Sequence, residues 1–254
     1  MEIPAVKHSA DKLQERLNRF AERYRRIVEA GHGVCLTDNA MGNLAFQGHE
    51  LIRELGLPVP SGRVMVHINT FHTRKELHEI VDSCAEMGVG ELLVVSGDGS
   101  ARLPKLKPSD LEADVPGITS VELLAYLRRQ YKDIFRYGAV FNQYEPPEHE
   151  KEKLRRKLEA GAEFIITQPV LPGDPEIGEL RRTLPVPLFL EVWMSPKIDL
   201  LSQCVGRKIG ISSYDPLESL ENMHRTYPEC PAYLAMVDFK TQFDQLARSG
   251  EKTA

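Results

Sequence analysis

The sequence is poor in cysteine and has no long apolar run, and both absences narrow the class of protein. Its four cysteines, Cys35, Cys84, Cys204 and Cys230, lie far apart without a C-x-x-C spacing. This arrangement favours buried, reduced thiols over a disulfide framework or a zinc site. No apolar run approaches the roughly 18 residues that a membrane-spanning helix needs, and the N-terminus lacks the apolar segment of a signal peptide. We therefore expect a cytoplasmic protein with no membrane partner.

An excess of positive charge is also missing. The 254-residue chain carries 32 Lys and Arg against 37 Asp and Glu, a formal net charge of −5. Binding nucleic acid requires a basic face, so we expect no nucleic-acid partner. The histidines show no metal-ligand spacing, which predicts no metal site. Neither GxGxxG nor GxxxxGK[ST] follows the first apolar run, which argues against the Rossmann and P-loop folds.

Short apolar runs alternate with amphipathic segments along the whole chain. The apolar runs are Glu2–Val6, Gly33–Thr37, Arg63–Ile68, Glu91–Ser96, Arg136–Phe141, Phe164–Gln168, Pro187–Trp193, Lys208–Ser212 and Ala232–Val237. The segments with helical periodicity are Asp11–Ala30, Gln47–Leu55, Thr73–Met87, Thr119–Tyr131, Glu148–Ala160, Asp174–Thr183, Lys197–Val205, Pro216–Arg225 and Thr241–Arg248. Strands that alternate with helices imply crossover connections and a parallel sheet.

Length and alternation together predict a single (β/α)₈ TIM barrel, an α/β fold of about 250 residues. We expect one domain over residues 1–254, with a disordered tail at 249–254. Because there is one apolar run more than the barrel needs, either Glu2–Val6 or Lys208–Ser212 is expected to be irregular.

Polar residues lie where the apolar runs end, and in a parallel barrel those ends form the active face. They are Thr37, Asp38, Asn39, His67, Asn69, Ser96, Asp98, Asn142, Gln143, Thr167, Gln168, Glu191 and Asp238. Each also has an ordinary structural explanation. Residues 37–39 suit a turn, His67 suits a satisfied core histidine, and Glu191 suits an ion pair. From their places we predict Asn142 and Glu191 as substrate contacts.

The segment from Lys157 to Gln168, Lys-Leu-Glu-Ala-Gly-Ala-Glu-Phe-Ile-Ile-Thr-Gln, resembles the helix–strand signature of methylenetetrahydrofolate reductases. Supporting pieces occur in the family's order: Glu2-Ile-x-Pro4, Leu36-Thr-Asp-Asn39, His67 and Ser96-Gly-Asp98. The resemblance implies a (β/α)₈ barrel that binds FAD. It also implies reduction of 5,10-methylenetetrahydrofolate to 5-methyltetrahydrofolate in one-carbon metabolism, with hydride passing through the flavin and NAD(P)H as a candidate donor.

The resemblance also implies roles for individual residues. Asp98 would hydrogen-bond the folate and tune the flavin, and Gln168 would contact the folate and the nicotinamide donor. Glu2 would match the glutamate that acts as general acid and protonates the folate nitrogen.

Five further residues fall at flavin-binding positions of the family. Thr37 and His67 resemble flavin contacts, and Phe141 is placed to stack on the ring. Arg156 and Lys157 lie where the family meets the FAD phosphates, which suits cationic side chains.

The chain also departs from the family. Ser96 stands where members usually carry Arg before Gly-Asp, and the stretch Phe141–His149 replaces a usual aromatic-Pro-Glu-Gly-His sequence. These changes weaken an extended FAD site more than a compact folate pocket. The alternatives are a flavin-independent folate enzyme, either a direct nicotinamide-dependent reductase or a tetrahydrofolate-dependent methyltransferase, and a non-catalytic partner of a redox complex. A homo-oligomer or a redox partner subunit is compatible with each.

Overall fold

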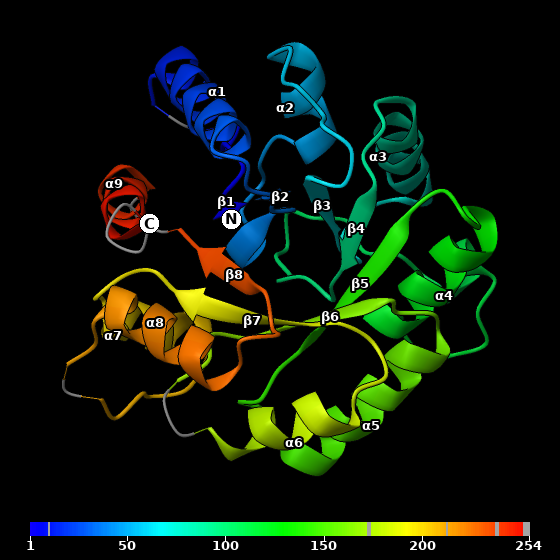
Figure 1. The fold of residues 1–254 in the computed structure, drawn as a ribbon. Helices are drawn as coiled ribbons and strands as arrows, with labels where there is room; N and C mark the ends of the chain where they lie inside the picture. Colours follow the sequence, from blue (N-terminus) through cyan, green and yellow to red (C-terminus); the bar gives the residue numbers. More distant parts are fainter. Residues whose placement is uncertain (10, 172–173, 212, 237–238, 251–254) are drawn as a thin grey trace. The chain divides into compact units, whose positions relative to one another are not determined.

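A computed structural model describes residues 1–9, 11–171, 174–211, 213–236 and 239–250. The strands follow one another in chain order, from β1 to β8, in a closed barrel (Figure 1). The strands are β1 (Glu2–Ile3), β2 (Val34–Leu36), β3 (Val64–Ile68), β4 (Glu91–Val94), β5 (Arg136–Phe141), β6 (Phe164–Thr167), β7 (Leu188–Trp193) and β8 (Ala232–Ala235). The prediction of a (β/α)₈ barrel is confirmed.

Helices connect successive strands. The α-helices are α1 (Leu13–Glu29), α2 (Gly48–Glu54), α3 (Arg74–Glu86), α4 (Ser120–Gln130), α5 (Pro147–Glu159), α6 (Pro175–Thr183), α7 (Ile198–Cys204), α8 (Pro216–Thr226) and α9 (Phe239–Gly250). Two 3₁₀ helices, η1 (Ala40–Gly42) and η2 (Pro108–Leu111), lie in loops. By its internal contacts the chain divides into two compact units, the first comprising residues 1–140 and 153–163 and the second 141–152 and 164–254. The prediction of a single domain is not tested by this division.

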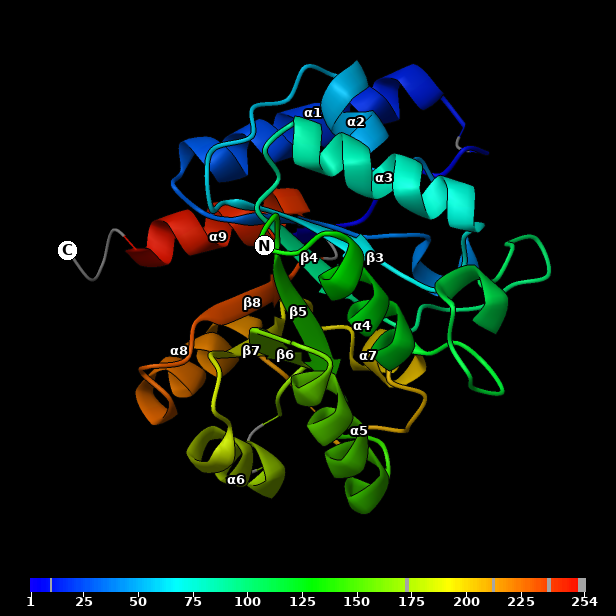
Figure 2. The same cartoon turned by 90° about the vertical axis from the view of Figure 1, so that its right-hand side faces the viewer.

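In the first unit, the parallel strands β1 to β5 carry an apolar outer face. Ile3, Leu36 and Val66 are in register with one another and at most 2% exposed. Gly48 at the start of α2 packs directly on Leu36 and Val66, because a Cβ on it would lie 3.2 Å from each side chain. Helices α1, α2 and α3 cover this face (Figures 1 and 2). The alternate residues of the same strands therefore point into the barrel.

Local sequence explains where several helices begin. Thr73 precedes α3 and accepts a hydrogen bond from the Glu76 backbone N–H at 3.2 Å, while the Glu76 carboxylate accepts one from the Thr73 N–H at 2.7 Å. Thr119 and Glu122 form the same capping box at α4. Each box satisfies backbone N–H groups that the first helical turn leaves without partners.

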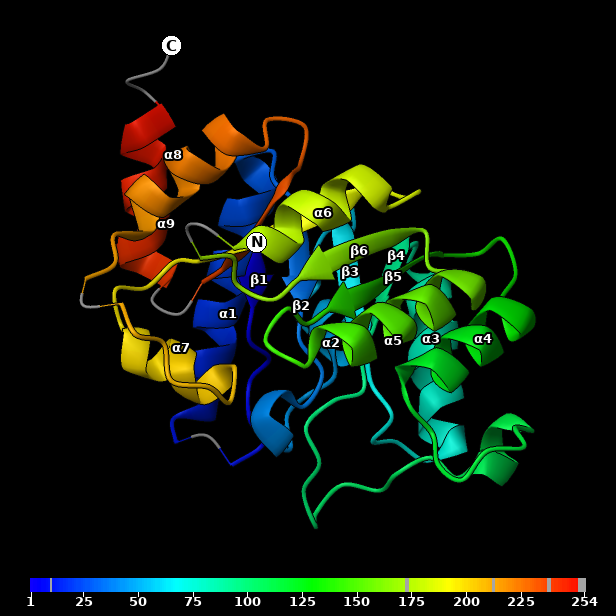
Figure 3. The same cartoon turned by 90° about the horizontal axis from the view of Figure 1, so that it is seen from below.

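In the second unit, β6, β7 and β8 pair in parallel, and α8 packs against β7. Figure 3 shows the helices α6, α7 and α8 of this unit from below. Residues 208–211 of the predicted run Lys208–Ser212 form no strand, and residue 212 lies outside the described residues. This run is therefore the irregular one of the two alternatives, and its Ile209 packs in a cluster with Trp193, Leu201 and Ala235. At the N-terminus the chain does form a strand, although β1 is shorter than predicted.

Other predictions have mixed outcomes. Helix α9 ends at Gly250 and residues 251–254 lie outside the described residues, so the disordered tail expected at 249–254 stays a prediction. Cys35, Cys84 and Cys230 are buried and outside any disulfide, as predicted, whereas Cys204 is exposed on the last turn of α7. Among the described helices, none combines the length and the apolar character required to cross a membrane.

Candidate functional site

Three predicted residues of the first unit share the inner face of the sheet. Glu2 pairs with Cys35 and Cys35 with Met65, so alternation places Thr37 and His67 on the same face as Glu2. The Thr37 Oγ1 accepts a hydrogen bond from the Ala5 N–H at 3.1 Å.

Burial lowers the pKa of His67, and the negative charges of Glu2 and Asp38 only partly oppose this shift. The imidazole is therefore neutral near pH 7. The structure thus brings the predicted acid and two predicted flavin contacts to one side of the strands.

Asp98 lies in the loop after β4 and is exposed. Its Oδ2 accepts a hydrogen bond from the Met41 N–H at 2.8 Å, which ties the loop after β4 to the loop after β2. Gly97 has φ +77°, and a Cβ at this position would lie 2.7 Å from the Cβ of Asn69. Only glycine permits this close approach, so the residue before Asp98 is fixed against the end of β3.

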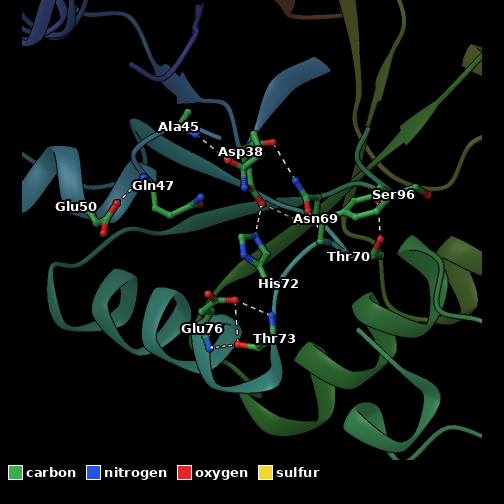
Figure 4. A network of polar contacts seen from close by, with 12 residues as sticks. Asp38, Ala45, Gln47, Glu50, Asn69, Thr70, His72, Thr73, Glu76 and Ser96 are labelled. Carbon is green, nitrogen blue, oxygen red and sulfur yellow. Dashed lines mark hydrogen bonds and ion pairs between the residues drawn. The ribbon is translucent and has the colours of Figure 1, made fainter. Parts of the chain in front are cut away.

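Asp38 and Asn69, both expected at strand ends, form a buried cluster with His72, which the sequence did not indicate (Figure 4). Asp38 Oδ2 accepts hydrogen bonds from the Asn69 N–H at 2.9 Å and from His72 Nε2 at 2.7 Å. Asn69 Nδ2 donates in return to the Asp38 carbonyl at 2.9 Å. The Asp38 and His72 side chains are 1% and 5% exposed. A buried carboxylate needs such partners because burial removes its hydration.

A weak signal for this cluster exists in the sequence. Asp38 and Asn69 both follow apolar runs directly, but residues 38 and 72 are too far apart for any local pattern to pair them. Beside the cluster lies a cavity of about 200 Å³ whose lining includes Asn39, His49 and His72.

The two cations predicted to meet the FAD phosphates are engaged within the first unit. Arg156 Nη2 lies 2.7 Å from Glu122 Oε1. Lys157 is only 6% exposed, and its Nζ donates to the Val140 carbonyl at 2.6 Å. Both side chains therefore have partners other than a ligand.

In the second unit, Gln168 is held by Gln143, a polar residue after β5 for which the sequence predicted no individual role. Gln143 Nε2 donates to the Gln168 carbonyl at 2.8 Å, and Gln143 Oε1 accepts from the Gln168 N–H at 3.2 Å. The Gln168 side-chain amide makes no hydrogen bond to the part of the chain that the structure describes, so it is available to a ligand. A polar amide two residues after Phe141 is the only sequence signal for Gln143.

The remaining predicted residues of this unit are placed as follows. Asn142 donates its N–H to Glu150 Oε1 at 3.0 Å, and its Oδ1 accepts from the Tyr144 N–H. Glu191 is half-buried in β7, and its N–H donates to Thr167 Oγ1 at 3.0 Å. Phe141 is 2% exposed, so its ring has little surface to offer a flavin. The functional roles of these residues stay predictions.

The fold defines the class of the protein: a (β/α)₈ barrel that carries polar side chains after its strands, the usual place for catalysis in this fold. The family model described as methylenetetrahydrofolate reductase matches residues 5–174. The chain belongs to this family and is a folate-related reductase of one-carbon metabolism. The matched segment includes Thr37, His67, Asp98 and Gln168, whereas Glu2 and Glu191 lie outside it.

Solved structures show the fold alone. A 2,3-dimethylmalate lyase of the PEP mutase/isocitrate lyase superfamily aligns with a TM-score of 0.52 and 12% identity, covering 99% of this chain and 81% of the other. A lyase/mutase described as putative, from Burkholderia cenocepacia J2315, aligns with a TM-score of 0.51 and 16% identity over the same shares. Among curated proteins, none matches the chain.

Proposed function

We propose that the chain reduces 5,10-methylenetetrahydrofolate to 5-methyltetrahydrofolate. The observation that supports this most is the position of Asp98. It lies within the segment matched by the family and presents an exposed carboxylate whose Oδ2 is already fixed by the Met41 N–H. A carboxylate fixed in this way suits the hydrogen-bond donors of a pterin ring.

The residues predicted to hold FAD do not fit its diphosphate. Lys157 is buried against the Val140 carbonyl, and Arg156 is paired with Glu122. Ser96, where the family usually has arginine, is a neutral hydroxyl whose Oγ lies 3.3 Å from the Oγ of Ser120. An FAD site would need cations facing the phosphates. This observation favours the flavin-independent alternative, in which hydride comes directly from a nicotinamide donor.

The proposed reaction is balanced with one hydride and one proton. Hydride leaves C4 of the reduced nicotinamide and adds to the methylene carbon, the bond from that carbon to N10 breaks, and N10 takes a proton. Glu2 supplies the proton, and Asp98 binds the pterin. In the second unit, Gln168 is a ligand contact in its own right. Because the pKa of His67 is lowered by burial, its ring adds no positive charge beside Glu2 near pH 7.

The experiment uses NAD(P)H deuterated at C4, 5,10-methylenetetrahydrofolate and the purified chain. We expect folate-dependent oxidation of the nucleotide and full retention of deuterium in the product methyl group, measured by mass spectrometry. A flavin intermediate would exchange the label with solvent, so loss of label together with a visible flavin spectrum would contradict direct transfer.

The same assay tests the other functions. Methyl transfer from a donor to tetrahydrofolate without nucleotide oxidation would indicate a methyltransferase and would overturn the proposal. Inactivity of the chain alone, with activity restored by a co-purifying redox subunit, would indicate a partner role.

A further inference from the structure

We infer that Asp38 and His72 are a positioning pair that holds the carboxylate of Asp98 in its folate-binding place. This inference rests on the proposed function, since it concerns the same site. Neither residue is a predicted ligand contact, and both are buried within the first unit. Their action on the ligand is therefore indirect and passes through the loops after β2, β3 and β4.

The first step is the clamp between the ends of β2 and β3. Asp38 Oδ2 accepts hydrogen bonds from both the Asn69 N–H and His72 Nε2. The side-chain amide of Asn69 donates to the Asp38 carbonyl. Three hydrogen bonds, two of them to a carboxylate, fix the point where the chain leaves β2. Hydrogen bonds to a charged group are stronger than neutral ones, particularly where water is excluded.

The second step is the loop that starts at this point. Asn39 and Met41 have φ angles of +46° and +57°, a left-handed conformation that asparagine tolerates but methionine rarely adopts. Such a conformation persists only where neighbouring contacts enforce it. The contacts are the clamp at Asp38, the bond from the Ala45 N–H to Asn39 Oδ1 at 3.0 Å, and the bond from the Met41 N–H to Asp98.

The third step is the packing of the β4 loop on the same elements. Gly97 lies against the side chain of Asn69, and a Cβ on Gly42 would lie 3.0 Å from the Gly99 carbonyl oxygen. Asp98 is therefore held by its neighbours on both sides and by Met41 at its own carboxylate. Loss of the hydrogen bonds to Asp38 should make the loop after β2 more mobile. Met41, whose N–H donates to Asp98 Oδ2, lies in that loop and moves with it.

His72 contributes a hydrogen-bond donor rather than bulk. Its Nε2 is the atom that meets Asp38, and a glutamine side chain carries an amide N–H at nearly the same distance from the backbone. Leucine fills a similar volume without a donor. The pair His72→Gln and His72→Leu therefore separates the hydrogen bond from the packing.

The test compares Asp38→Asn, His72→Leu and His72→Gln with the wild type. The first readout is amide hydrogen exchange of segments 37–46 and 95–103 in the free protein, which needs no ligand. We expect about tenfold faster exchange in these segments for Asp38→Asn, whose uncharged oxygen accepts both buried bonds more weakly, and for His72→Leu, which loses one of them. For His72→Gln we expect near wild-type exchange. Asp110→Asn is the matched control. The Asp110 carboxylate accepts a similar hydrogen bond, 2.8 Å long, from the Lys107 backbone N–H, and it does not belong to this cluster.

The second readout is the kinetics of folate reduction. We expect KM for the folate to rise about tenfold in Asp38→Asn and His72→Leu while kcat changes by less than about threefold, because the pair acts on binding through Asp98. His72→Gln should restore KM.

Unchanged exchange and KM in Asp38→Asn would overturn the inference, as would equal damage in His72→Gln and His72→Leu. If His72→Leu does not fold, Asp38→Asn decides. A wild type that binds no reduced folate would overturn the proposed function, and hydrogen exchange would then still decide whether Asp38 holds the Met41 loop.

Discussion

The side chain of Gln143 makes two hydrogen bonds to the backbone of Gln168. Its amide nitrogen donates to the Gln168 carbonyl, and its amide oxygen accepts from the Gln168 N–H. The same amide nitrogen also lies 3.2 Å from the Pro169 carbonyl. Gln143 is buried, whereas Gln168 is only half-buried. Gln143 therefore positions Gln168, and the side chain of Gln168 is the one available to a ligand.

Gln143→Met should impair both stability and turnover. The substitution keeps the length of the side chain and removes its hydrogen bonds, each worth about 1 kcal/mol, so the free energy of unfolding should fall by about 1–3 kcal/mol. We expect kcat/KM for the folate to fall about tenfold, because Gln168 loses its fixed place. Urea unfolding and steady-state kinetics measure the two effects.

Gln130→Met is the matched control, since Gln130 is exposed at the end of α4. If Gln143→Met has wild-type kinetics while Gln168→Met loses kcat/KM, then Gln168 keeps its position without the two hydrogen bonds from Gln143.

Asp98→Asn should lower folate reduction without unfolding the chain. The asparagine oxygen can still accept the Met41 N–H, so the loop contact survives while the charge is lost. A hydrogen bond to a charged group contributes about 1.5–3 kcal/mol, which corresponds to a fall of roughly 10- to 100-fold in kcat/KM. Asp114→Asn, at an exposed position of the same unit, controls for net charge. If folate affinity and turnover in Asp98→Asn equal those of the wild type, Asp98 is not the pterin ligand.

The fold was predictable from the sequence because its signal is local and repeated. Each strand is a short apolar run followed by an amphipathic helix, and capping residues such as Thr73 and Glu76 mark helix starts. The run Lys208–Ser212 shows the limit of that signal, since its Ile209 packs in an apolar cluster without belonging to the sheet and only the structure decides which of the two candidate runs is irregular.

From the sequence, a candidate site residue can be proposed only where one residue carries the signal alone. Asp98 is such a candidate because it follows an apolar run directly, and its role stays a prediction. The bond between Asp38 and His72 depends on how two loops meet, and no spacing in the sequence encodes it. Lys157 shows the same limit, because no pattern in the sequence indicates that its Nζ donates to the Val140 carbonyl.

Stability should depend on pH through His67. Burial is the main cause that lowers the pKa of this imidazole below its ordinary value of 6.5. Between that lowered value and 6.5 the unfolded chain binds a proton that the folded chain does not, so the free energy of unfolding falls as pH drops through this window. His49, whose pKa is also lowered mainly by burial, acts in the same direction.

We expect His67→Gln to lose less stability than the wild type between pH 7 and 5, measured by urea unfolding at each pH. The exposed His224 gives the control His224→Gln. Equal losses in the wild type and His67→Gln would mean that His67 accepts a proton in the folded state as readily as in the unfolded one.

Cysteine labelling should separate two thiols of very different environment. Burial raises the pKa of Cys84 to about 12, so at pH 8 only about one thiol in ten thousand is ionised. Cys204 is exposed at the end of α7. With iodoacetamide at pH 8, we expect rapid alkylation of Cys204 and alkylation of Cys84 only after unfolding in urea, both followed by peptide mass spectrometry. Cys204→Ser should remove the fast label. Rapid labelling of Cys84 in the native chain would instead require α3 to open locally, since the thiolate is the reacting species and the closed helix keeps it from forming.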